Sequence, residues 1–155
     1  METGCAGAMN FVGVNAQGKV GCVGISVLHY ETASPARPSS ADRLVCQVRV
    51  STELYSASLS ATCSAAGLRR FCDQLRHSLA QSSGVAALES DDGALRLKVE
   101  VFPSGSSSTS GLVQVPGRPE TALCFSFGGT EFALRAECAE LEAACFTYPE
   151  RIGSI

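Results

Sequence analysis

Charge is scarce in this sequence, and the scarcity argues against nucleic acid as a partner. Only 17% of the 155 residues are charged, which is below the usual share of about 25%. The 12 Lys and Arg residues are scattered along the chain, and the net charge is −3. Nucleic-acid binding draws most of its affinity from neutralising phosphates. We therefore expect no nucleic-acid partner.

Long apolar runs are also missing. No stretch approaches the roughly 18 apolar residues that span a bilayer. The segment from Met1 to Asn10 carries an acidic Glu2 and no Lys or Arg, whereas a secretory signal peptide begins with basic residues and continues with a long apolar stretch. We expect a cytoplasmic protein that does not associate with membranes.

Motifs for metals and cofactors are absent as well. None of the eight cysteines forms a C-x2-C pair, the spacing typical of zinc sites. Cys138 and Cys145 share a stripe with Leu134 and Leu141, which favours core packing over a metal site. Gly128-Gly129 is followed by no Lys, so a tight turn is favoured over a phosphate cradle. We expect neither a metal nor a cofactor.

No catalytic pair stands out. Cys72 and His77 lie five positions apart on an expected helix, so their side chains diverge around its axis, while Asp73 and His77 are four apart and could pair. Without an export signal, we expect the cysteines to be reduced and mostly buried. These patterns predict that the protein is not an enzyme.

Apolar residues make up 45% of the sequence, which is enough for a continuous core. Its length favours a single domain over residues 1–155. Alternating apolar and polar residues indicate strands. The expected strands cover residues 10–14, 19–30, 43–50, 54–63, 85–89, 94–102, 112–115 and 121–127.

Two amphipathic helices are expected. The first begins at the N-cap Ser64 and ends near Gln81, and the second begins at Thr130. Their apolar stripes consist of Leu68, Phe71, Leu75 and Leu79, and of Leu134, Cys138, Leu141 and Cys145.

Three segments are expected to lack regular structure. Residues 32–42 and the tail 147–155 are interrupted by Pro or Gly, and Pro103 to Ser110 predicts an exposed hairpin loop. Asp92-Gly93 indicates a tight hairpin turn. In such a turn, Asp91 and Asp92 are better explained by hydrogen bonds to the backbone than by a catalytic role.

Strands grouped in hairpins and two one-sided helices predict an α+β fold. We expect a curved, mostly antiparallel sheet of about seven to eight strands with both helices packed on it. The layout repeats strands followed by a helix, without an evident sequence repeat.

The polar face of the strand pair 43–50 and 54–63 is the candidate binding surface. If the two strands form a hairpin, Gln47 and Arg49 lie next to Ser56 and Ser58 on its solvent-exposed face. Such a face is either ordinary solvated sheet or a surface for a partner. We take Gln47, Arg49, Ser56 and Ser58 as candidate partner-binding residues, with the loop 103–110 as a second candidate.

The order of core positions from Leu44 to Cys145 resembles a bacterial family. The residues that carry it are Leu68-x-x-Phe71-x-x-x-Leu75-x-x-x-Leu79, Asp92-Gly93, Leu95-x-Leu97-x-Val99, Gly111 to Val115, Leu123 to Phe127, Leu134 and Leu141. They resemble small bacterial proteins that include immunity proteins of toxin–immunity pairs, among them those linked to wall-associated, contact-dependent toxins. The resemblance excludes the first forty residues, and the tryptophans of related sequences are missing here.

The resemblance implies a cytoplasmic protein that binds and neutralises a cognate protein toxin. Its modest negative charge would speed association with a basic toxin. Two other functions stay open: a structural or assembly subunit that forms a homo-oligomer, and a small-ligand-binding domain.

Overall fold

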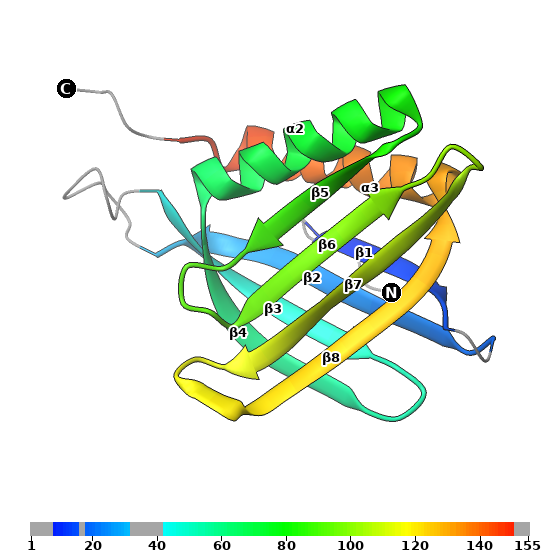
Figure 1. The fold of residues 1–155 in the computed structure, drawn as a ribbon. Coiled ribbons are helices and arrows are strands. Elements are labelled where there is room, and N and C mark those ends of the chain that lie inside the picture. Colours follow the sequence, from blue (N-terminus) through cyan, green and yellow to red (C-terminus); the bar gives the residue numbers. More distant parts are fainter. Residues whose placement is uncertain (1–7, 16–17, 32–41, 151–155) are drawn as a thin grey trace, which may run out of the picture.

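The computed structural model describes residues 8–15, 18–31 and 42–150 (Figure 1). Most of the loop expected at 32–42, and the end of the expected irregular tail, lie outside the described residues. The elements in chain order are β1 (Ala8–Val14), β2 (Val20–Tyr30), β3 (Arg43–Ser51), β4 (Ser56–Ser64), α2 (Ala65–Gln81), β5 (Gly84–Glu89), β6 (Leu95–Val101), β7 (Ser106–Val115), β8 (Arg118–Thr130) and α3 (Glu131–Thr147).

The expected α+β fold is confirmed. The eight strands form one antiparallel sheet in the order β4-β3-β2-β1-β8-β7-β6-β5. Each run of four strands is followed by a helix of 17 residues. Both helices lie side by side across the same side of the sheet (Figure 1). The chain is thus built from two consecutive units of the same layout.

The two units start their helices in the same way. Ser64 caps α2 by accepting a hydrogen bond from the backbone N–H of Gly67, and Thr130 caps α3 by accepting one from Ala133. Each cap satisfies an N–H group that the first turn of a helix leaves unpaired. The expected apolar stripes are the buried faces of the two helices, apart from added residues such as Ser78 and Ala144.

The sheet is almost divided at its centre. β1 and β8 meet at a single pair, Val14 and Gly128, before β8 ends and α3 continues alongside β1. There the carboxylate of Glu137 accepts a hydrogen bond of 2.7 Å from the backbone N–H of Asn10. A helix side chain therefore takes the hydrogen bond that a neighbouring strand would otherwise supply.

The outer edges of the sheet are tied in a related way. The β5–β6 turn reaches edge strand β4, where the N–H of Asp91 donates to the carbonyl of Thr62 at 2.7 Å. The Thr62 N–H in turn donates to the carboxylate of Asp92 at 3.2 Å. On the other edge, Gln74 of α2 accepts from the N–H of Ala87 in β5 at 2.9 Å. These bonds cover parts of edges that would otherwise be open to other strands.

Both units contribute to one core. Phe11 of β1 meets Phe71 of α2 edge-to-face, with ring centroids 6.2 Å apart. Phe127 of β8 packs over Gly13 and Gly21 of the first unit, where a Cβ atom would lie 2.8 Å and 3.2 Å from its ring. The hydroxyl of Tyr55 also donates to the carbonyl of Cys124 in β8. The two ends of the sheet therefore curve toward each other around a shared interior.

Two expectations about loops were wrong. Ser106 to Ser110 belong to β7, and the turn is confined to the residues just before them. Ser107 and Thr109 are buried in a strand that pairs with β6 and β8 on its two sides, so backbone pairing overrides a composition typical of loops. Gly128-Gly129 is likewise the paired end of β8, not a tight turn.

Candidate functional site

The four candidate binding residues share the face of the sheet that is turned away from the core. Gln47 and Arg49 lie on β3, and Ser56 and Ser58 on β4, with Arg49 directly opposite Ser58 in the register. The Gln47 side-chain amide donates to the Ser58 hydroxyl at 2.5 Å. Val48 and Val50, which alternate with them, are buried in the core. The β3–β4 hairpin therefore brings these polar groups together as expected.

A shallow pocket of about 540 Å³ lies beside them. Gln47 and Arg49 line it together with Ser26 of β2, while α3 supplies Glu137 and Glu140. Within the described residues Arg49 makes no ion pair, so its guanidinium is available to a bound group. The pocket thus combines donors on the sheet with two carboxylates from the helix that fills the β1–β8 gap.

The pKa of Glu137 is raised. Burial of the carboxyl group is the main cause, the hydrogen bond from Asn10 opposes it, and the nearby charge of Glu140 adds to it. A desolvated carboxylate is costly unless it is well paired. A partner cation that reached Glu137 would therefore find a carboxylate whose charge the protein only partly compensates.

The edge of β4 next to this face is partly open. The backbone groups of Thr62 point away from β3, because they bond to the β5–β6 turn. Strand geometry gives residues two apart the same backbone direction, so the N–H and C=O groups of Ser58 and Ser60 point to the same outer edge. The side chains there are small, and Ser56, Ser58 and Ser60 are exposed.

Sequence reasoning missed a second, larger concavity. It has a volume of about 880 Å³ and lies over β5–β7, beside α2. Arg70 of α2 lines it with Arg96 and Lys98 of β6, and Arg96 is paired with Glu89 at 2.8 Å. The exposed alternation of Arg96 and Lys98 was visible in the sequence. The approach of Arg70 was not, because it depends on how α2 packs beside β5.

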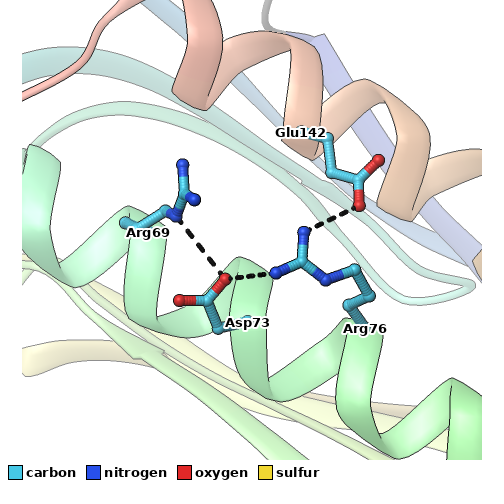
Figure 2. A network of polar contacts seen from close by, with 4 residues as sticks. All are labelled: Arg69, Asp73, Arg76 and Glu142. Carbon is cyan, nitrogen blue, oxygen red and sulfur yellow. Dashed lines mark hydrogen bonds and ion pairs between the residues drawn. The ribbon is translucent and has the colours of Figure 1, made fainter.

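Three cysteines meet between the two helices. The thiols of Cys138 and Cys145 on α3 hydrogen-bond to Cys72 on α2, and these bonds are the main reason that the pKa of Cys72 is lowered, with Arg76 and Arg69 adding to it. All three side chains are buried. Asp73 and His77, whose spacing allows them to pair, form no ion pair in the described part of the chain. Asp73 instead pairs with Arg69 at 3.5 Å and with Arg76 at 2.9 Å, and Arg76 reaches Glu142 of α3 at 3.2 Å (Figure 2).

Each of the seven cysteines in the described ranges is free, and five of them are buried. Among the same residues, no cluster of His, Cys, Asp or Glu has an arrangement that would hold a metal ion. No helix within these ranges is both long enough and apolar enough to cross a bilayer.

The predicted loop site at 103–110 is not a loop of that length, since Ser106 to Ser110 belong to strand β7. The polar face of β3 and β4 remains, extended by the pocket and by the open β4 edge. Comparisons of the chain with models of protein families, with curated proteins and with solved structures found no match.

Proposed function

We propose that this chain is a non-enzymatic protein-binding domain, an immunity protein that neutralises a cognate bacterial toxin by direct binding in the cytoplasm. The observation that carries the proposal is the partly open edge of β4 beside a polar face. The outward backbone groups of Ser58 and Ser60 have the geometry to pair with an added strand. Gln47 and Arg49 stand next to that edge with side chains suited to selecting the partner.

The pocket beside this face supports the same function. Arg49 favours an acidic group on the partner, whereas Glu137 and Glu140 favour a basic one a short distance away. A partner that presents both charges in the matching order gains specificity, because a reversed order brings like charges together. The resemblance of the core positions to those of immunity proteins supports a toxin as that partner.

The test uses the product of the gene that neighbours this one, expressed in bacteria with and without this chain. We expect the neighbouring product alone to stop growth and the pair to grow. Purified together, the two proteins should form a stoichiometric complex. A neighbouring product that is harmless, or that remains toxic and unbound when this chain is present, would contradict the proposal.

Two variants locate the interface. Ser60→Pro removes an outward N–H from the β4 edge, and Ser60→Ala keeps that N–H as the matched control. Arg49→Glu reverses the charge at the pocket, and Lys98→Glu makes the same change on the sheet face of the second unit. We expect Ser60→Pro and Arg49→Glu to weaken the complex at least about tenfold and the two controls to leave it intact. Circular dichroism checks that each variant is folded.

Binding of a small anion is the second candidate function, and the concavity beside α2 favours it. Arg70 and Lys98 line that space without an ion pair in the described part of the chain. Thermal unfolding with and without inorganic phosphate tests this function. A concentration-dependent rise in melting temperature that is lost in Lys98→Ala would support it.

A further inference from the structure

The outward side of α3 is apolar, although it faces solvent. Phe132 and Phe146 are each 86% exposed, and between them Ala136, Ala139 and Ala143 are exposed as well. The five residues are spaced at 4, 3, 4 and 3 positions, so they form one continuous line along the helix. We call this line the outer stripe. It lies nearly opposite the buried stripe of Leu134, Cys138, Leu141 and Cys145.

Helix α2 shows that such a stripe is not a requirement of the fold. The two helices have equal length and equivalent caps. When they are aligned from Ser64 and Thr130, the three alanines of the outer stripe correspond to Arg70, Asp73 and His77 of α2. One helix therefore carries charged or polar side chains where the other carries alanines bracketed by two phenylalanines. Clustered exposed apolar residues of this kind mark interaction surfaces.

We propose that the outer stripe is the interface through which two copies of this chain pair, with their α3 helices antiparallel. Self-complementarity is the first reason. Ala139 lies seven residues from each phenylalanine, so a twofold axis at the centre of the helix sets Phe132 of one copy beside Phe146 of the other and places the alanines of the two copies opposite one another. Alanines allow the close approach of two helices, and a twofold pair needs a surface that matches itself.

Charge decides the orientation. Arg135 and Glu142 flank the same side of the outer stripe, seven residues apart, and their side chains are 55% and 44% exposed. In an antiparallel pair, Arg135 of each copy lies near Glu142 of the other, so two opposite-charge contacts form. In a parallel pair, the flank that carries Arg135 and Glu142 would face the opposite flank of the partner's stripe, so neither of these contacts would form. Glu142 is held in place by Arg76 of α2 (Figure 2), which orients it at the edge of this surface.

The contact extends beyond a single helix ridge. A groove of about 270 Å³ separates α2 from α3, and Leu79, Ala80 and Ala139 contribute its apolar lining. It borders the outer stripe at Ala139 and adds area to the interface. One helix pair with such a margin is still at the small end of stable interfaces, so we expect a reversible dimer with a dissociation constant on the order of 10 μM.

Sedimentation equilibrium of the purified full chain tests the proposal over concentrations of about 1 to 500 μM. We expect a monomer–dimer equilibrium. The double variant Phe132→Ser/Phe146→Ser should weaken dimerisation at least about tenfold while keeping the unfolding midpoint of the parent. The control is Leu54→Ser, since Leu54 is 88% exposed in the β3–β4 turn, far from α3 in the sequence, and its replacement should leave the equilibrium unchanged.

The charge pair gives a second, independent readout. Arg135→Glu should weaken the dimer, and adding Glu142→Arg should restore it, because the swapped charges attract again across the interface. A chain that stays monomeric at the highest concentration would overturn the proposal, as would a dimer that the phenylalanine variants leave intact. The dimer does not depend on the toxin, so loss of toxin binding with dimerisation intact would refute only the proposed function.

Discussion

At the scale of single residues, Asp92 shows how a turn carboxylate can have a structural role. One oxygen accepts from the N–H of Ala94 at 3.1 Å and the other from the N–H of Thr62 at 3.2 Å. The carboxylate therefore shapes its own turn and also holds that turn to β4. The expectation that Asp92 serves the backbone agrees with these bonds, but the link to β4 has no signal in the local sequence.

Replacing Asp92 by Ala should destabilise the protein by about 1–3 kcal/mol, because a half-buried N–H of Thr62 loses its acceptor. Urea unfolding followed by circular dichroism measures the change. Asp91→Ala is the matched control, since Asp91 reaches Thr62 through its backbone N–H. Equal losses in the two variants would show that the Asp92 carboxylate has no such role.

Glu137 predicts a dependence on pH. Its pKa in the folded state is raised above the ordinary 4.5, chiefly by burial. Protonation of Glu137 therefore favours the folded state. The contribution of this group to the free energy of unfolding is complete below pH 4.5 and is lost as the pH rises through the raised pKa. Glu137→Gln keeps an oxygen to accept from Asn10. We expect it to gain stability relative to the parent between pH 4 and pH 7, as measured by urea unfolding. A difference that stays constant with pH would contradict the assignment.

At the scale of elements, the junction of β1 with β8 depends on a close approach of two backbones. A Cβ atom on Gly13 would lie 2.1 Å from the carbonyl oxygen of Gly128 and 2.8 Å from the Phe127 ring. At Gly128 itself, the nearest atom to such a Cβ would be 3.5 Å away, which is ordinary contact. The two strands can therefore meet because Gly13 has no side chain.

Gly13→Ala should lower the free energy of unfolding by about 2 kcal/mol or more, because either the strands separate or Phe127 leaves its site. Gly128→Ala, across the same junction, should cost less than about 1 kcal/mol. Chemical denaturation of the two variants compares them directly. If Gly13→Ala were tolerated as well as Gly128→Ala, the tight junction would be refuted.

At the scale of the whole molecule, the two units share a core and should unfold together. Phe127 of the second unit lies over glycines of the first, and Tyr55 bonds to the carbonyl of Cys124. The chain has no tryptophan and three tyrosines, so tyrosine fluorescence reports on the first unit and the start of the tail. We expect fluorescence and far-UV circular dichroism to give coincident urea transitions. Two separated transitions would mean that the units fold independently.

Structural features that depend on residues close together in the chain could be predicted from the sequence. Alternation identified β3, β4 and β6, and three- and four-residue spacing identified the buried faces of both helices, because these periods follow from local backbone geometry. The same alternation placed Gln47, Arg49, Ser56 and Ser58 on one face. The hairpin pairing that joins them needs only a short connection, so it too lies within reach of the sequence.

Features that depend on distant residues could not be read in this way. Glu137 and Glu140 join Arg49 at the pocket only because β8 pairs with β1 at a single position and α3 then lies along β1. Ser106 to Ser110 form a strand because β6 and β8 supply hydrogen-bond partners on both sides, which no serine-rich composition indicates. The sequence by itself determined most of the elements, the buried faces of the helices and the α+β class, since these follow from backbone periodicity and apolar burial. Tertiary structure alone decided the strand order, the divided centre of the sheet, the thiol cluster and the pocket, because each is formed by groups brought together from separate parts of the chain.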